Sequence, residues 1–202
     1  MDNEVFLNNV DAEADAVRSR LQSRWQSPNG RAIAARVVTA LRTQQPWSSH
    51  VASLPDVDEV MNRQDLRGAP LGGIALDNAD LRATELEFID LHAASLKDAD
   101  FRGSNLSRSD LSAANLANAN CAGAHLMLAN LQGANLTEAN LAGALLTGAN
   151  LQGANFTNAI LRGAVLLGAK TDGAIFEGAV MDGIRLGNFA EPAKTSSGSG
   201  GM

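Results

Sequence analysis

The sequence contains no tyrosine, a single cysteine (Cys121) and only 4% aromatic residues among 202 positions. One cysteine excludes an intrachain disulfide, so no internal crosslink stabilises the fold, and the chain suits a reducing compartment. No apolar run approaches the roughly 18 residues that a membrane-spanning helix needs, and no basic-then-apolar leader opens the sequence. We therefore expect a cytoplasmic protein without membrane insertion.

Charge is also scarce over the middle of the chain. Residues 111–161 contain no lysine or arginine and one acid, Glu138, whereas residues 77–110 contain eight acids. The net charge is −6, and no basic stripe marks a nucleic-acid groove. This distribution argues against direct nucleic-acid binding.

What the sequence does have is a five-residue repeat that holds one phase from Leu66 to Leu186. Of the 25 positions at this spacing, 19 are Leu and three are Phe, and the other three are Cys121, Thr171 and Met181. The residue two places before each of them is Ala at 18 of 24 positions from Ala69 to Ile184. So regular a repeat predicts a solenoid.

A period of five suits neither a helix nor a straight strand. Successive Leu residues would wander around a helix and would alternate between the two faces of a strand. All of them stay inside only if the chain turns a corner in every repeat. Ala and Leu, two residues apart, then both point inward, the residue between them points outward, and the two residues after Leu form the corner. The second corner residue is often Gly, which tolerates tight turns.

Several repeats resemble the A(D/N)LXX signature of the pentapeptide-repeat proteins. Examples are Ala-Asp-Phe-Arg-Gly at 99–103, Ala-Asn-Leu-Ala-Gly at 139–143 and Ala-Asn-Leu-Gln-Gly at 149–153. The resemblance covers about residues 65–188 and implies an all-β solenoid, a right-handed quadrilateral β-helix with four repeats per coil. Twenty-five repeats would then make about six coils, roughly 30 Å of rod.

The remaining sequence predicts three parts. Residues 1–64 are expected to be a helical segment and linker, with helices over 11–26 and from Pro28 to about Thr43, followed by a linker at 46–55. Residues 65–188 form the β-helix, and residues 189–202 are expected to be a disordered Gly/Ser tail. The N-terminal helices could cap the first coil, and an uncovered C-terminal end could join two rods end to end.

Catalytic motifs are absent. The three histidines are scattered, and no cysteine pair or phosphate loop occurs. Asp80 and Asp100 stack in one column and could suggest a carboxylate site, but Arg82 and Arg102 are placed to pair with them. We therefore expect no enzymatic activity, no cofactor and no metal. The stacked asparagines of residues 115–155 are expected to form amide ladders between coils.

One side of the predicted rod is apolar on its outer surface. Its candidate partner-binding residues are Phe88, Met127, Leu128, Leu145, Val165 and Leu167. A contiguous apolar strip on a soluble rod usually contacts something. The occupant could be residues 10–43 of the same chain, a second copy in a homodimer, or another protein of unknown identity.

These features predict a non-catalytic scaffold that binds another protein through one flat side of the β-helix. The family resemblance supplies an alternative, because some pentapeptide-repeat proteins mimic duplex DNA and protect DNA gyrase or topoisomerase from quinolone-type toxins. This chain departs from that group, since its central residue is mostly Leu, no loop interrupts the repeats, and residues 111–161 lack the acids of a phosphate mimic.

Overall fold

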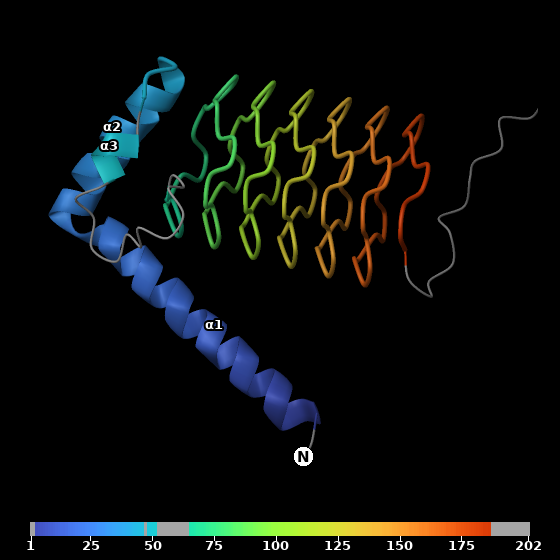
Figure 1. Ribbon diagram of the computed structural model, residues 1–202, viewed down its shortest axis with the longest axis horizontal. Coiled ribbons are helices and arrows are strands. Elements are labelled where there is room, and N and C mark those ends of the chain that lie inside the picture. The colour runs from blue at the N-terminus through green and yellow to red at the C-terminus, as the bar shows by residue number, and fades with distance from the viewer. Residues whose placement is uncertain (1–2, 47, 52–64, 187–202) are drawn as a thin grey trace, which may run out of the picture.

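A computed structural model describes residues 3–46, 48–51 and 65–186 of the chain, and the side chains from residue 12 onward in its first helix. It consists of α1 (Asn3–Gln26), α2 (Pro28–Arg42), a single turn α3 (Ser48–Val51) and a β-helix over residues 65–186 (Figure 1). The predicted tail at 189–202 and half of the linker predicted at 46–55 (residue 47 and residues 52–55) lie outside the described residues.

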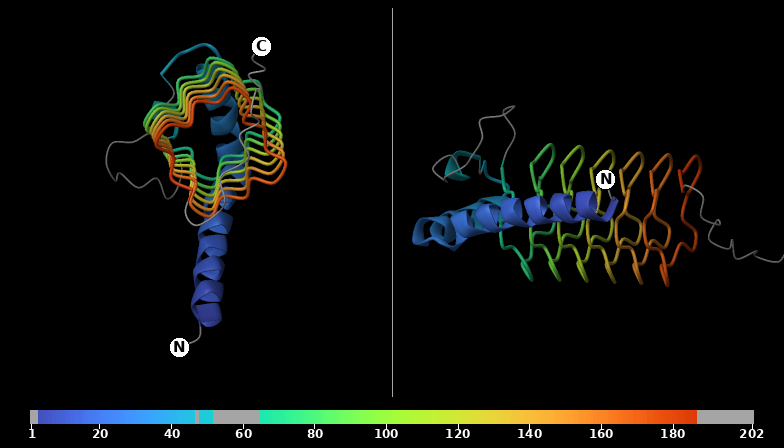
Figure 2. Two further views of the ribbon diagram at one scale, coloured as in Figure 1. Left: turned by 90° about the vertical axis from the view of Figure 1, so that its right-hand side faces the viewer. Right: turned by 90° about the horizontal axis from the view of Figure 1, so that it is seen from below.

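The β-helix is a right-handed coil with four sides. Parallel bridges join each outward residue to the residue twenty places later, as in the pair Asp65 and Glu85. Four such columns run along the coil, and they start at Asp65, Pro70, Ala75 and Asp80. The view down the coil axis shows the four sides enclosing the interior (Figure 2, left). The fourfold coil that the family resemblance implied is confirmed.

Each repeat turns its corner with the same hydrogen bonds. At a representative corner, the Leu131 carbonyl accepts from the Ala134 amide (3.0 Å), and the Leu131 amide donates to the Asn150 carbonyl in the next coil (2.7 Å). Gly133, the second corner residue, has a φ of +65°, the left-handed conformation that the third residue of a type II turn requires. Backbone pairing and corner geometry therefore repeat together every five residues.

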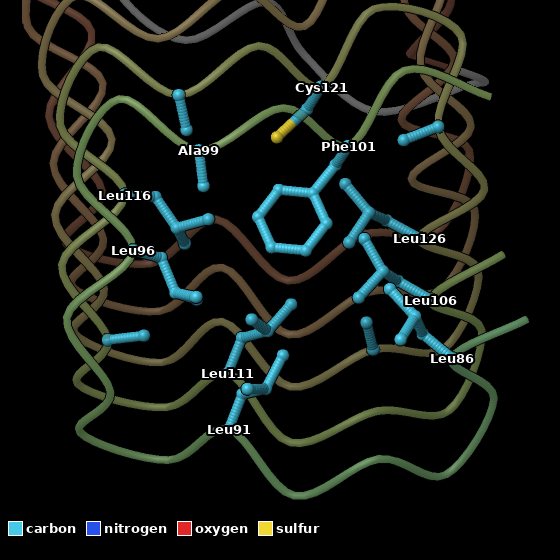
Figure 3. Close-up of a cluster of buried hydrophobic side chains, with 14 of the residues drawn as sticks. Leu86, Leu91, Leu96, Ala99, Phe101, Leu106, Leu111, Leu116, Cys121 and Leu126 are labelled. Carbon is cyan, nitrogen blue, oxygen red and sulfur yellow. The ribbon is translucent and has the colours of Figure 1, made fainter. Parts of the chain in front are cut away.

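The interior is a continuous apolar core of the predicted Leu and Ala positions. Side chains of unequal size compensate for one another, since the ring of Phe101 lies across the interior below the small side chain of Cys121 (Figure 3). Phe156 and Phe176 stack with their centroids 5.0 Å apart. Cys121 is fully buried, and desolvation raises the pKa of its thiol to about 12, which leaves it unreactive.

Because Leu131 points inward and Gln132 points outward, a change to Asp should affect stability very differently at the two positions. Leu131 is 1% exposed and Gln132, the next residue, is exposed. Leu131→Asp places a carboxylate in a core without partners and should cost several kcal/mol, whereas Gln132→Asp should be within about 0.5 kcal/mol of the parent. Thermal denaturation of the two variants measures the difference, and equal shifts would contradict the assigned phase.

The N-terminal helices cap the first coil. Ser27 is the N-cap of α2, its hydroxyl accepting from the Gly30 amide at 2.9 Å, and Pro28 occupies the first turn as the sequence predicted. A Cβ on Gly30 would collide with the Arg24 carbonyl oxygen, so glycine permits the close approach of α1 and α2. The apolar stripe of α2 joins the core of the coil through Ile33, Val37 and Leu41.

A buried ion pair fixes α1 to the coil. Both terminal nitrogens of the Arg24 guanidinium donate to the Asp65 carboxylate, at 2.9 and 3.1 Å, and one also donates to the Arg67 carbonyl. The Trp25 indole donates to the same carbonyl at 2.9 Å. These donors satisfy backbone and carboxylate oxygens at the first coil, where no preceding coil exists to do so. The predicted capping role of the helices is thus confirmed.

Two element boundaries differ from the sequence prediction. The first helix begins at Asn3, eight residues before the predicted start at Asp11. Val10 continues the helical spacing of Ala14 and Val17 beyond Asp11, so the predicted start was too late. The segment predicted as a linker contains α3, whose Val51 is 3% exposed and packs in the core. A short helical turn is stabilised here by that tertiary contact rather than by its own propensity.

The cap should be acid-labile. Burial alone would raise the pKa of Asp65, but hydrogen bonds from Arg24 and Arg67 outweigh it and hold the pKa at about 2. A folded pKa below the unfolded value gives stability that is present above about pH 4 and is lost as the pH falls towards 2. The shift corresponds to about 2 kcal/mol.

Denaturant unfolding between pH 5 and pH 2 measures this contribution. The parent chain should lose about 2 kcal/mol more over that range than the double variant Arg24→Met with Asp65→Asn, which removes the acid without leaving a buried unpaired charge. An identical pH dependence for both proteins would show that the pair does not stabilise the cap.

Candidate protein-binding surface

Five of the candidate residues gather on one side of the coil and along one of its edges. Leu145 and Val165 are neighbours in one outward column, and both are half-buried. Met127, Leu128 and Leu167 lie on the corner that follows this column and are 37%, 53% and 36% exposed. The described part of the chain has five exposed large hydrophobic side chains, and these corner residues are three of them. We call the two column residues and the three corner residues the apolar strip.

Phe88, the sixth candidate, is not available to a partner. It is 5% exposed, because α1 passes over it and the Arg18 guanidinium lies 5.5 Å from its ring centroid. The sequence correctly placed Phe88 on the outer surface but could not show that the chain's own helix covers it. Phe88 is thus covered by the chain's own helix, whereas Leu128, two coils further along the same edge, is exposed.

The edge that carries Phe88 and Leu128 is unusual in its backbone. Its left-handed corner positions form a corner column of six residues: Gly68, Phe88, Arg108, Leu128, Gly148 and Gly168. The other non-glycine corner residues of the coil are Ala, Asn, Asp or Glu, whereas this column holds Phe, Arg and Leu at φ values of 58–59°. The left-handed conformation costs a bulky residue roughly 1–2 kcal/mol. Strain of this kind suggests that the side chains serve a purpose outside the coil.

The Leu128 side chain extends from its own corner over the corner of the next coil. A Cβ added to Gly148 would lie 2.7 Å from a Leu128 methyl carbon, so the Leu128 side chain lies along the corner over the next coil. The absence of a side chain at Gly148 makes room for it. Arg108, Gly148 and Gly168 were missed as parts of this surface from the sequence. Reading every twentieth residue from Gly68 would have found them.

Outside the strip, the surface is mostly polar, and Ile160 and Ile175 on two other sides are the exposed large hydrophobic residues there. Arg82 and Arg102 each pair with the aspartate two residues earlier at 2.7 Å, and Arg82 also approaches Asp100 diagonally at 3.8 Å. Hydrogen bonding from Arg82 lowers the pKa of Asp80. The carboxylate column is therefore balanced as predicted, with the pairs within each corner closer than the diagonal one.

The predicted amide ladders are also present. The Asn135 side-chain amide donates to the Asn115 side-chain oxygen at 3.1 Å, and Asn150 donates to Asn130 in the same way at 3.2 Å. The same oxygens accept from the backbone amide two residues on, Asn115 from Ala117 and Asn130 from Gln132. These side chains link successive coils and give the central coils an outer surface of uncharged amides.

The described residues include no group of three or more His, Cys, Asp and Glu side chains arranged to hold a metal ion. Among the described helices, none combines the length and the apolar character that crossing a bilayer requires. The described surface therefore offers apolar contacts, which are the apolar strip and the separate Ile160 and Ile175 side chains, together with paired charges and amides.

Comparison with known proteins agrees with the coil geometry. Pentapeptide repeats, eight copies in all, match residues 94–133 and 124–163. A pentapeptide repeat protein of the cyanobacterium Cyanothece 51142, Rfr23, is 33% identical over 57% of this chain and 89% of its own, with a TM-score of 0.43. The chain belongs to the pentapeptide repeat family. Proteins of this family are generally non-catalytic scaffolds.

Other solved members of the pentapeptide repeat family are matched over smaller shares of their own length. One from the thylakoid lumen of Arabidopsis thaliana is 33% identical over 47% of this chain and 66% of its own, with a TM-score of 0.47. QnrB1, a plasmid-mediated fluoroquinolone resistance protein, is 24% identical over 62% and 63% of the two chains, with a TM-score of 0.46. No curated protein matches the chain.

Replacement of Leu128 distinguishes a binding surface from a structural one. If the Leu128 side chain does not stabilise the coil, Leu128→Gly should relieve the left-handed strain and leave the free energy of unfolding unchanged or raised by up to about 1 kcal/mol. Thermal denaturation measures this, with Glu138→Gly, a left-handed corner residue of the same coil, as control. A loss greater than about 1 kcal/mol would mean that Leu128 is needed for folding.

Proposed function

We propose that this pentapeptide repeat protein is a non-catalytic scaffold that binds another protein through the apolar strip. The observation that carries the proposal is Leu128, which is 53% exposed in a strained backbone conformation. Met127 and Leu167 extend the exposed apolar surface along the same edge. Side chains that cost stability and remain in water are best explained by a partner that covers them.

The DNA-mimic alternative has weaker support. Such a mimic needs an unpaired row of acids, but Asp80 and Asp100 pair with Arg82 and Arg102, and residues 111–161 contain a single acid. The likeness to QnrB1, at 24% identity, carries no argument about function. We accordingly expect the protein to leave gyrase supercoiling, with and without a quinolone, unchanged.

Site-specific photocrosslinking in the native cell tests the scaffold proposal. p-Benzoylphenylalanine at position 127 should form a discrete protein adduct, and Leu167→Lys in the same chain should abolish it. Gln132 is the matched control, because it occupies the equivalent place at the next corner and is exposed on a different side. Adducts of equal yield from positions 127 and 132 would contradict the proposal, as would an adduct that is insensitive to the lysine.

A further inference from the structure

The apolar strip lies between two arginines along the rod. Arg108 stands in the corner column one coil before Leu128. Arg185 follows Val165 in the outward column that also contains Leu145, because parallel bridges join these residues in turn. All five strip residues therefore lie in the coils between the two arginines. Just under four coils separate Arg108 from Arg185, which makes about 18 Å along the rod.

The two guanidinium groups are accessible and have no ion pair of their own. Arg185 is exposed and Arg108 is half-buried, and the described residues place no carboxylate within 4.0 Å of either. Burial raises the pKa of the Glu87 carboxyl, and the charge of Arg108 opposes that rise from a distance. Arg82 and Arg102, at the other edge of the same side, are instead each held by an aspartate at 2.7 Å. The arginines at the ends of the strip are thus the ones that can accept a carboxylate from outside.

The acids on this side of the coil and at the corner that follows it all precede Arg108. They are Asp65 and Glu85 in the outward column and Glu87 at the corner. Between Arg108 and Arg185 the same side and corner carry apolar, glycine and hydroxyl residues, together with one exposed histidine, His125. An imidazole can add positive charge but no negative charge. The surface is therefore apolar in its middle, basic at both ends and free of acids.

We propose that the partner of the strip presents an apolar segment with a carboxylate at each end, one for Arg108 and one for Arg185. The inference rests on the proposed function, because it specifies the chemistry of the partner that the strip binds. Arginine suits this role, since its planar guanidinium binds a carboxylate through two parallel hydrogen bonds. The span of about 18 Å corresponds to five or six residues of an extended segment or about twelve residues of a helix.

The middle and the ends of the surface contribute differently to recognition. The exposed Met127, Leu128 and Leu167 side chains supply the apolar contact. Ion pairs at the rim add little affinity each, but they steer the encounter and fix the orientation of the partner. A carboxylate placed over the apolar middle would lose its water without gaining a partner, and a lysine at either end would be repelled. The arrangement therefore selects segments whose acids are terminal and not central.

Charge reversal at the two ends tests the proposal in the full chain and in the native cell. The p-benzoylphenylalanine probe at position 127 lies between the arginines, so its protein adduct reports occupancy of the strip. At expression levels where the adduct is far from saturation, Arg108→Glu and Arg185→Glu should each lower its yield about fivefold. The double reversal should lower it about 25-fold, because sites about 18 Å apart act independently.

Lys97→Glu is the matched control for the change in charge. Lys97 is an exposed corner residue half a coil after Glu87, so it lies on the opposite edge, and its reversal should leave the yield within about twofold. Arg108→Lys and Arg185→Lys keep the charge and should retain at least about half of the yield. Arg108→Gln replaces Arg108→Glu if a further carboxylate beside Glu87 destabilises the corner, and it should still lower the yield about twofold or more.

The place of the crosslink in the partner supplies a second readout. Mass spectrometry of the adduct should locate it in an apolar segment with Asp or Glu on both sides. A segment without acids, a segment flanked by Lys or Arg, or arginine reversals that match the Lys97→Glu control would each overturn the proposal. Adducts formed only between two copies of this chain would overturn it as well, and would identify the second copy as the occupant.

Failure of this inference can be told apart from failure of the proposed function. An adduct at position 127 that Leu167→Lys abolishes, but that the arginine reversals leave unchanged, would retain the scaffold and remove the acidic partner segment. The absence of any protein adduct at position 127 would remove the scaffold and, with it, the partner segment.

Discussion

Every repeat of this chain must turn a corner while leaving the backbone paired to the coils on either side, and the rest of the structure depends on that requirement. The inward Leu and Ala, the outward bridge residue and the left-handed corner residue are three consequences of one geometry. Glycine meets the corner requirement without strain, and asparagine meets it at a lower cost than other residues. The left-handed corner residues with the bulkiest apolar or basic side chains, Phe88, Arg108 and Leu128, all lie on one edge. The bulky exceptions to the repeat therefore lie on the edge that carries its apolar strip.

A coil of this kind has a second requirement, because its first turn has no predecessor to hydrogen-bond. The helices supply the missing partners through Arg24 and Trp25. A buried pair such as Arg24–Asp65 is weak evidence for net stability, since desolvation offsets much of the attraction. Its geometry nevertheless fixes the direction in which α1 leaves the coil. The contacts that cap the first coil therefore also place α1 beside the corner column.

The sequence predicted the coil well because its determinants are local and repeated. Leu131 and Gln132 could be assigned to opposite faces from phase alone, and the amide ladders followed from the twenty-residue columns. The features that the sequence did not predict depend on contacts between segments that are far apart in the chain. Arg24 and Asp65 are 41 residues apart and no periodicity relates them, so the path of α1 and the burial of Phe88 could not be read from the repeat. The expected end-to-end contact of two rods stays a prediction.

The flat sides of the coil and the edge of Phe88 and Leu128 differ in the surface that they present. Outward residues of the flat sides bond to one another between coils, as Asn115 and Asn135 do. The edge instead holds large side chains in its second to fourth coils and then glycine, so Leu128 lies over a corner, Gly148, that has no side chain. A single edge can acquire such ridges and gaps through its corner residues while the other three edges remain structural, because the backbone pairing and the inward core are the same at every corner.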